Sequence, residues 1–282
     1  MANTIVKKRR LISGKVSELT IRAPEIAVGA KPGNFVVIRL NEKGERIPLT
    51  IADKDAEAGN ITIVYLVLGK STALLETFEE GDEILDVCGP LGKPTQINKK
   101  GRVVCVGGGT GIAAMHHIAK GHHEAGNHVA AVIGARSKDL LLFYDELGAF
   151  CPEVLVATDD GSFGHKGLVT EVLRKYLEEH SDVGEVVGVG PVPMMSAVAE
   201  VTRPFGIKTI VSLNSIMVDG IGMCGACRVS VDGRIRFACV EGPEFDAHKV
   251  DFDELSRRLK AFVPQEQESY KKFCKCHEQK EN

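Results

Sequence analysis

The chain has 282 residues, of which 44% are hydrophobic and 26% are charged, and its formal net charge is only −3. This balance is typical of a globular protein with room for two domains and a small appendage. The near-neutral charge and the lack of Trp argue against nucleic acid or an anionic membrane as a partner. No apolar run approaches the roughly 18 residues of a membrane span, and the basic start MANTIVKKRR lacks the apolar stretch of a signal peptide. With eight cysteines and no such signal, the sequence predicts a cytoplasmic protein whose thiols are free.

The first hundred residues are dominated by short apolar segments rich in β-branched side chains. These segments lie at 35–40, 61–68 and 83–89 and are separated by turn sequences such as KPGN and KDAEAGN. Short strands at this spacing predict a small antiparallel β-barrel over residues 1–98.

Two segments of this region carry polar groups suited to binding a phosphate or a ring edge. RIPLTI, residues 46–51, places a cation, a rigid Pro and a hydroxyl at the end of a strand. GKSTALLETF, residues 69–78, places Gly, Ser and Thr at the start of an amphipathic helical turn, where a pyrophosphate can bind. Each segment also has a simpler interpretation, as an edge strand with a surface Arg and as an ordinary helix N-cap.

Residues 99–213 follow a different pattern, in which apolar strands alternate with helix-like segments. Such alternation predicts a parallel sheet with helices on both faces. Ligands of these sheets bind at the carboxyl ends of the strands, where the strand order reverses. The first strand is expected to begin at 102, with further strands at 128–135, 153–158, 185–190 and 208–213 and helices at 166–180 and 192–206.

GGGTGIA, residues 107–113, follows a strand and opens a helix, which is the context of a dinucleotide-binding turn. Its glycines let a pyrophosphate approach the backbone amides at the helix N-terminus. After the third strand, Asp159 and Asp160 would repel a 2′-phosphate, whereas one of them can accept hydrogen bonds from a ribose diol. Arg136, after the second strand, favours NADP(H) if it binds a 2′-phosphate; alternatively, it contacts only the pyrophosphate. The balance favours NAD(H), with a solvated turn as the simpler explanation of the two aspartates.

The segment from Val218 to Cys239 contains three cysteines, and Asp219 lies five residues before the first of them. Plant-type ferredoxins hold a [2Fe–2S] cluster on a C-x4-C-x2-C run plus a distant Cys, and here the run is D-x4-C-x2-C followed by a further Cys. The sequence therefore predicts a [2Fe–2S] cluster, with nearby glycines that direct backbone amides at the sulfurs. A zinc knuckle and buried cysteines beside a turn aspartate are the alternatives, since Asp-Gly is also an ordinary turn. The four expected ligands are Asp219, Cys224, Cys227 and Cys239.

Four histidines lie on the helix that follows the glycine-rich turn. Their spacing does not match H-E-x-x-H or another metal-binding pattern, so they are expected to be surface or helix-face residues without a role. They are His116, His117, His122 and His123.

The last eighteen residues, 265–282, are charged and follow an amphipathic helix expected at 252–263. Cys274 and Cys276 lie in this tail, with His277 directly after them. A frayed terminus with spare thiols is favoured there over a metal site, and a contact with a partner is the third interpretation.

Taken in order, these segments resemble the ferredoxin–NADP reductase family. That family binds flavin with an R-x-Y-S/T run: here Thr50 matches the hydroxyl near flavin N5, Leu49 replaces the aromatic residue, and Arg46 lies one residue earlier than the usual phosphate-binding Arg. GPLGKP follows at 89–94, and GPVPMM at 190–195 matches the G-P-x-P-M-M run that lies beside the nicotinamide. The resemblance implies flavin contacts by Arg46, Pro48, Leu49, Thr50, Tyr65, Leu66, Gly69, Ser71 and Thr72, and NAD(H) contacts by Gly107, Gly108, Gly109, Thr110, Gly111, Asp159, Asp160, Gly190, Pro191 and Met194.

The resemblance extends to the C-terminal part of the chain. IMVDG-x-GMCGACRV, followed by FAC-x-EGPEFDAH, is similar to the small subunits of NADH-dependent reduced ferredoxin:NADP oxidoreductases, also described as sulfide dehydrogenase beta subunits. The related electron-transfer subunits of dihydroorotate dehydrogenase have Cys at the position of Asp219. The resemblance implies that this chain binds FAD, NAD(H) and a [2Fe–2S] cluster. It also implies a heterodimer with a larger subunit that carries flavin, [4Fe–4S] clusters and an NADP(H) site, and coupling to ferredoxin by electron bifurcation.

The sequence thus predicts a β-barrel flavin domain, an α/β nucleotide-binding domain with a parallel sheet, and a small C-terminal [2Fe–2S] segment. No side chain is expected to act as acid, base or nucleophile, because the cofactors carry the redox chemistry. The alternatives are a dihydroorotate dehydrogenase electron-transfer subunit and a zinc-stabilised nucleotide sensor without flavin. The expected domain boundaries are 1–98, 99–213, 214–250 and a C-terminal helix and tail at 251–282.

Overall fold

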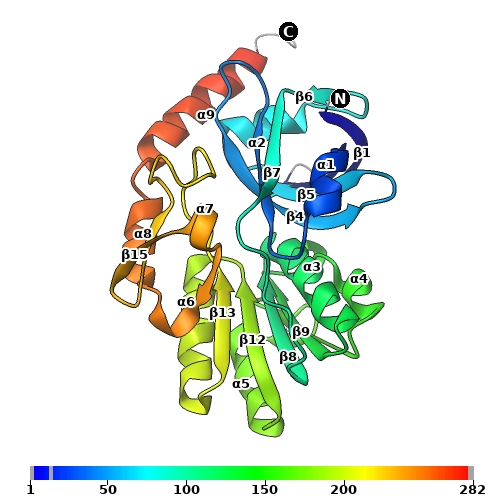
Figure 1. Cartoon of the computed structure of the whole chain (residues 1–282), viewed down its shortest axis with the longest axis vertical. Coiled ribbons are helices and arrows are strands. Elements are labelled where there is room, and N and C mark those ends of the chain that lie inside the picture. Colours follow the sequence, from blue (N-terminus) through cyan, green and yellow to red (C-terminus); the bar gives the residue numbers. More distant parts are fainter. Residues whose placement is uncertain (1–2, 13–14, 279–282) are drawn as a thin grey trace.

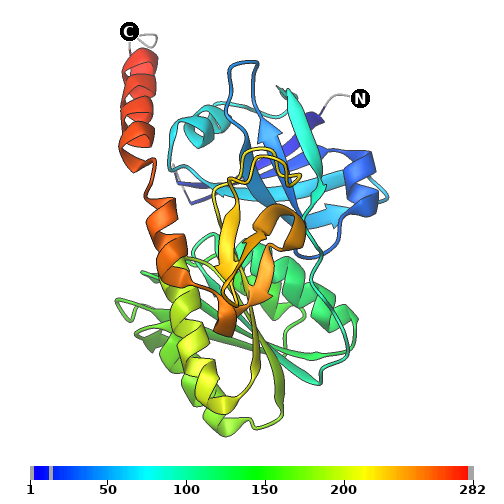
Figure 2. The ribbon, with the colours of Figure 1, turned by 60° about the vertical axis from the view of Figure 1, so that its left-hand side comes forward.

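The fold consists of two seven-stranded sheets and a small hairpin (Figure 1). A computed structural model describes residues 3–12 and 15–278 of the chain. The first sheet forms the N-terminal domain and the second the α/β domain. The segment after the last parallel strand lies along one side of both domains, and the C-terminal helices continue up that side (Figure 2).

The N-terminal sheet is antiparallel and nearly closed. Its strand order is β6-β1-β2-β5-β4-β3-β7, and its two edge strands are joined in the chain by Leu85 alone, so the edges meet. Alternate residues of the strands, such as Leu19, Ile21, Ile61 and Ile63, fill the interior because successive side chains of a strand point to opposite faces. The elements are β1 (Asn3–Ile12), β2 (Val16–Arg22), α1 (Pro24–Gly29), β3 (Phe35–Arg39), β4 (Ile47–Asp55), β5 (Asn60–Leu66), α2 (Lys70–Glu76), β6 (Glu83–Ile84) and β7 (Asp86–Leu91).

The α/β sheet has the order β11-β10-β9-β8-β12-β13-β16. The chain moves outward from β8 to β10 and then crosses to β12, so the order reverses between β8 and β12. Val103 and Cys105 pack in the core with α3, whereas Val104 and Val106 pack in the core with α5 and α6, which covers both faces of the sheet. The elements are β8 (Arg102–Gly108), α3 (Gly111–Glu124), β9 (His128–Ala135), α4 (Tyr144–Gly148), β10 (Glu153–Thr158), β11 (His165–Lys166), α5 (Val169–Glu179), β12 (Val183–Val189), α6 (Val192–Thr202), β13 (Lys208–Ser212) and three 3₁₀ turns at Lys138–Leu140, Arg203–Phe205 and Ala247–Lys249.

The segment after β13 packs against both domains. It contains the hairpin β14 (Arg228–Val231) and β15 (Arg234–Phe237), the short helix α7 (Ala238–Glu241), and β16 (Glu244–Asp246), which adds an antiparallel edge strand to β13. One hydrophobic core joins Phe35 and Val37 of the barrel to Cys227 and Cys239. Gly220, at φ +76°, lies so close to the barrel that a methyl group there would be 2.7 Å from Leu91 Cδ1. The segment is therefore fixed against the barrel by direct packing.

The C-terminal part is helical, so the expectation of a frayed terminus is wrong over the described residues. After α8 (Phe252–Leu259), α9 (Val263–Glu278) continues to the end of the described chain and contacts α2. Strong helix formers and an i,i+4 pair between Lys272 and Glu268, at 2.7 Å, favour this helix. Cys276 is exposed and Cys274 partly buried, whereas the side chain of His277 and residues 279–282 lie outside the described part. None of the described helices is both long and apolar enough to cross a membrane.

A partly buried hydrogen bond joins the segment after β13 to the linker between the two sheets. The hydroxyl of Thr95 donates to Glu244 Oε1 at 2.6 Å. Burial, helped by the negative charge of Glu185, raises the pKa of Glu244 to about 7, while the Thr95 hydroxyl and Lys208 oppose this rise. Because the pKa is higher in the folded than in the unfolded chain, the folded state holds an extra proton between about pH 4.5 and 7. Stability is therefore lost as the pH rises through this window.

We expect Glu244→Gln to remove most of this pH dependence, because the amide keeps an acceptor for Thr95 and cannot ionise. The gain in unfolding free energy should be about 3 kcal/mol at pH 8 and less than about 1 kcal/mol at pH 5, because the pKa is raised by about 2.5 units and each unit corresponds to about 1.4 kcal/mol. Urea unfolding at the two pH values measures it. Glu178→Gln, on the exposed surface of α5, is the control and should leave the pH profile unchanged. An unaltered profile in Glu244→Gln would exclude Glu244 as its source.

Candidate functional site

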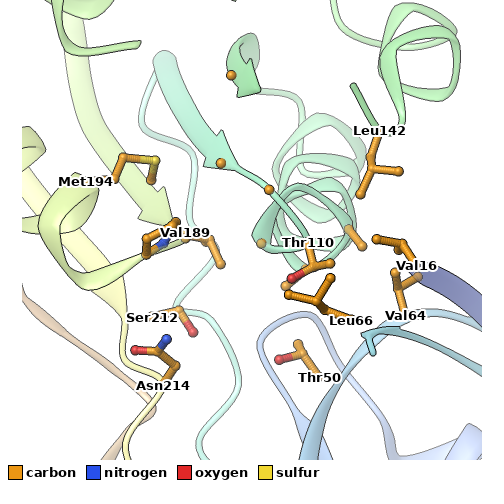
Figure 3. Close-up of a pocket in the computed structure, with 18 of the residues that line it drawn as sticks. Val16, Thr50, Val64, Leu66, Thr110, Leu142, Val189, Met194, Ser212 and Asn214 are labelled. Carbon is orange, nitrogen blue, oxygen red and sulfur yellow. The ribbon is translucent and has the colours of Figure 1, made fainter. Parts of the chain in front are cut away.

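A cavity of about 950 Å³ lies between the barrel and the carboxyl ends of the parallel strands (Figure 3). Both walls come from the elements that the sequence singled out, since β4 and β5 form one side and the turns after β8 and β12 form the other. The reversal of strand order between β8 and β12 places the cavity where open α/β sheets bind ligands. The predicted residues that line it are Pro48, Leu49, Thr50, Tyr65, Leu66, Gly108, Gly109, Thr110, Gly111, Asp159, Gly190, Pro191 and Met194.

The barrel wall of the cavity is formed around Thr50. This residue is partly buried on β4, directly opposite Phe35 on β3, and both line the cavity. Tyr65 is buried, and its hydroxyl donates to Glu76 at 2.7 Å, so its polar end is directed to α2 while its ring supports the wall. An apolar wall with one hydroxyl fits a planar ring such as isoalloxazine.

Four predicted flavin residues lie outside the cavity lining. Arg46 is exposed, and the hydroxyl of Ser71 donates to the carboxylate of Glu45 at 2.8 Å. Thr72 Oγ1 accepts hydrogen bonds from the backbone N–H groups of Leu68 and Gly69, at 3.0 and 3.2 Å, and thereby caps α2. Contacts of Arg46, Gly69, Ser71 and Thr72 with a flavin phosphate remain predictions.

The glycine-rich turn after β8 provides an open cradle. Gly109 has φ +57° and faces open space on the side where a Cβ would project. The N-terminus of α3, a helix of 14 residues, begins two residues later at Gly111. A helix N-terminus with an open approach fits a pyrophosphate. Gly107 lies underneath, where a methyl group would be 3.0 Å from Ile112 and Met115, so its role is in packing.

The structure separates the two aspartates after β10. Asp159 lines the cavity together with Arg136. Asp160 is not part of the lining, and its Oδ1 accepts hydrogen bonds from the backbone N–H and the hydroxyl of Ser162 at 2.9 and 2.6 Å. These bonds to Ser162 lower the pKa of Asp160. Asp159 is thus the carboxylate positioned to meet a ligand, and Asp160 stabilises the turn.

The predicted cluster ligands occupy one loop and the adjoining helix α7. Cys227 and Cys239 are buried with their sulfurs 3.1 Å apart, whereas Cys224 is exposed. Backbone N–H groups are directed at the sulfurs: that of Ala226 lies 3.5 Å from Cys224 Sγ, and that of Cys239 lies 3.4 Å from Cys227 Sγ. Amides directed at thiolates are the second shell that a negatively charged cluster needs, so the site fits the group.

Asp219 lies at the entrance of this loop. Its Oδ2 accepts from the backbone N–H of Cys224 at 2.6 Å and its Oδ1 from that of Ile221 at 3.0 Å, and these bonds lower the pKa of Asp219. The ionised carboxylate still has free lone pairs for a metal. Among the described residues, no three ligating side chains converge on one point, and this holds for the predicted cluster ligands as well as for a zinc knuckle.

The cavity and the cluster loop share packed side chains. Phe35, Leu213 and Met217 line the cavity and belong to the same hydrophobic core as Cys227 and Cys239. The chain from Ser212 to Met217 therefore forms a cavity wall and, two residues later, reaches Asp219. The sequence did not identify this wall, nor Lys15, as part of the cavity lining. The one signal for the wall was the position of Ser212 at the end of the last parallel strand, where ligands of such sheets bind.

The histidines of α3 are mostly buried, so the surface interpretation is wrong for three of them. His117 Nδ1 lies 2.9 Å from the carbonyl oxygen of Ile51, next to Thr50, and must carry the proton because that oxygen can only accept. His116 and His122 are also buried, and only His123 is exposed. Burial lowers the pKa of all three buried rings. His117 docks α3 on the barrel, whereas His116 packs against Phe143 and Phe150 and His122 lies beside Asn127 within the α/β domain.

Comparison with known proteins adds to this geometry. Residues 214–251 match the family described as the iron-sulfur cluster binding domain of dihydroorotate dehydrogenase B. A Thermotoga maritima protein named dihydroorotate dehydrogenase B (NAD(+)), electron transfer subunit homolog, is 51% identical over 274 residues, which cover 97% of this chain and 96% of the relative. The electron transfer subunit from Geobacillus thermodenitrificans is 34% identical over 254 residues, covering 87% and 96%. A chain of the solved NADH-dependent reduced ferredoxin-NADP oxidoreductase, a structure concerned with flavin-based electron bifurcation, superposes with a TM-score of 0.92 at 48% identity, covering 97% of this chain and 98% of that one.

Proposed function

The chain belongs to the family of dihydroorotate dehydrogenase B electron-transfer subunits and their homologues, and on this premise we propose that it connects an NAD(H) site to an iron–sulfur cluster through FAD. It is an oxidoreductase subunit, and the predicted family resemblance and fold class are confirmed. Its cofactors are FAD, NAD(H) and an iron–sulfur cluster. When bound, these groups supply hydride exchange between NAD(H) and the flavin and single-electron exchange between the flavin and the cluster.

The observation that carries this proposal is the wall shared by the cavity and the cluster loop. Phe35 lies opposite Thr50 in the barrel and packs in the core that holds Cys227 and Cys239. A ring bound against Thr50 would thus be separated from the cluster loop by packed side chains. We infer a short path for electrons between the two sites.

The side chains of this chain bind, orient and exclude water. In the proposal, Thr50 donates a hydrogen bond at the reacting edge of the flavin, and Leu49 and Tyr65 support its ring. The turn from Gly108 to Gly111 holds the pyrophosphate of NAD(H), and Gly190, Pro191 and Met194 lie beside its nicotinamide. The cluster is held by Asp219, Cys224, Cys227 and Cys239.

Asp159 should set the preference for NADH over NADPH. We expect Asp159→Asn to weaken NADH binding and strengthen NADPH binding, changing the ratio of the two dissociation constants by about tenfold, because the repulsion of a 2′-phosphate is removed. Titration of the flavin absorption with each nucleotide measures the ratio. Asp160→Asn is the matched control, because Asp160 is bonded to Ser162 outside the cavity lining. An equal effect of both variants would contradict the assignment.

We further propose that the chain acts in a heterodimer with a larger flavin- and [4Fe–4S]-containing subunit that reduces NADP and exchanges electrons with ferredoxin by bifurcation. The similarity to the ferredoxin-NADP oxidoreductase chain at 48% identity supports this assignment. The second candidate is a dihydroorotate dehydrogenase subunit, which the names of several relatives favour. Asp219 favours the first, since the dihydroorotate subunits have Cys at this position.

Assay of the anaerobically purified native complex distinguishes the two candidates. We expect NADP⁺ reduction that requires NADH and reduced ferredoxin together, and no NAD⁺ reduction with dihydroorotate. Reduction of NAD⁺ by dihydroorotate would assign the chain to the second candidate instead.

A further inference from the structure

The chain from Ser212 to Ser215 forms a polar patch in an otherwise apolar part of the cavity wall. It leaves the carboxyl end of β13 and lines the cavity with the side chains of Ser212, Asn214 and Ser215. Figure 3 places Ser212 and Asn214 on the side of the cavity opposite Thr50. A ring bound between these two walls would present an edge to the patch.

Within the patch, Ser215 gives the strongest indication that a ligand binds here. It is only 5% exposed, and its hydroxyl oxygen has no hydrogen-bond partner among the described residues. Three other buried side-chain atoms of the described residues share this property, in Asn60, His116 and His122, but none of these residues lines the cavity. Buried hydroxyls are almost always hydrogen-bonded, so an unpartnered one in a cavity wall indicates a partner supplied by a ligand.

The chemistry of the patch defines that ligand group. Hydroxyl and primary amide side chains each donate and accept hydrogen bonds and carry no charge. Of the charged residues of the lining, Arg136 and Asp159 follow β9 and β10 on the other side of β8, and Lys15 lies in the barrel directly before β2. The patch is therefore suited to a neutral edge that combines a carbonyl oxygen with an N–H group.

We propose that Ser212, Asn214 and Ser215 form a receptor for the amide-type edge of a cofactor ring, with Ser215 as its buried anchor. The proposal rests on the function proposed above, in which two groups have such an edge: the carboxamide of nicotinamide and the pyrimidine ring of flavin. Because the same segment continues through Met217 to Asp219, a hydrogen bond at Ser215 also fixes the start of the cluster loop.

Ser215→Ala in the full-length holoprotein tests the receptor, with Ser196→Ala on α6, outside the cavity lining, as the control. Three quantities are measured: the dissociation constants of NADH and of its 3-acetylpyridine analogue, which lacks the amide N–H group; the flavin content and absorption maxima; and Tm. We expect no fall in Tm beyond that caused by weaker flavin binding, because the hydroxyl that is removed has no partner among the described residues. Ligand binding should weaken by about tenfold, which corresponds to one lost hydrogen bond.

The outcomes of this experiment show whether the nicotinamide carboxamide or the flavin supplies the amide-type edge. A tenfold loss for NADH with little loss for the analogue assigns the receptor to the carboxamide. A lower flavin content with shifted absorption and an unchanged preference for NADH over the analogue assigns it to the flavin. If neither changes in Ser215→Ala or in Asn214→Ala, the receptor is refuted. Wild-type protein that binds neither flavin nor NADH would instead contradict the proposed function.

Discussion

Replacing Cys227 by alanine is expected to lower the iron content of the purified protein by at least tenfold while the flavin is retained. Cys227 is 2% exposed, and its sulfur lies 3.1 Å from that of Cys239, so alanine removes a ligand from the centre of the site. The barrel has a separate hydrophobic core, which does not include this cysteine, and should keep its cofactor. Iron analysis and the visible spectrum of the variant measure both effects.

The matched control is Cys88→Ala, because Cys88 is an exposed cysteine on β7 outside the cluster segment. Its iron content should equal that of the wild type. Wild-type iron in Cys227→Ala would remove this residue from the coordination sphere, and stoichiometric zinc in the wild type would support the zinc alternative.

Gly111→Ala is expected to weaken NADH binding by tenfold or more and to destabilise the fold by about 1–3 kcal/mol. A methyl group at this position would lie 2.6 Å from the carbonyl oxygen of Val189 and 2.8 Å from Cα of Gly190. Both contacts are with backbone, so the start of α3 and the end of β12 must move apart. Those two segments form the proposed dinucleotide site, and a shift there misplaces its amides.

NADH titration and urea unfolding measure the two effects of Gly111→Ala. Gly148→Ala on α4 is the control, because a methyl group there meets nothing within 4 Å. It should bind NADH like the wild type and be equally or slightly more stable. If Gly111→Ala binds NADH normally, the pyrophosphate does not lie at this turn.

The fold was largely predictable because its signals are local. Short apolar segments rich in β-branched side chains defined the barrel strands, and continuous apolar strands such as Val103–Val106 defined the parallel sheet. The glycine turn and the cluster spacing each lie within a few consecutive residues. Such patterns predict the structure well because they depend only on residues that are close together in the chain.

Other features were not predictable because they depend on contacts between distant residues. Thr95 and Glu244 are 149 residues apart in the chain, and nothing near either one indicates their hydrogen bond. The burial of His117 follows from the docking of α3 on the barrel. No sequence motif singled out Ser215, and only the fold places it in the cavity wall.

The predicted site residues also differ in how far the sequence alone could place them. Thr50 and Leu49 line the cavity, whereas Arg46, one residue out of the usual register, is exposed. The two aspartates were indistinguishable in sequence, and only the bonds of Asp160 to Ser162 separated them.

The most direct test of the electron path is the EPR spectrum of the anaerobic holoprotein after addition of NADH alone, for wild type and Asp219→Ala. The account predicts bleaching of the flavin band and a reduced [2Fe–2S] signal in the wild type, and a signal of altered g values in Asp219→Ala. Flavin bleaching without any cluster signal, in protein that contains its full iron, would contradict the connection between the two sites.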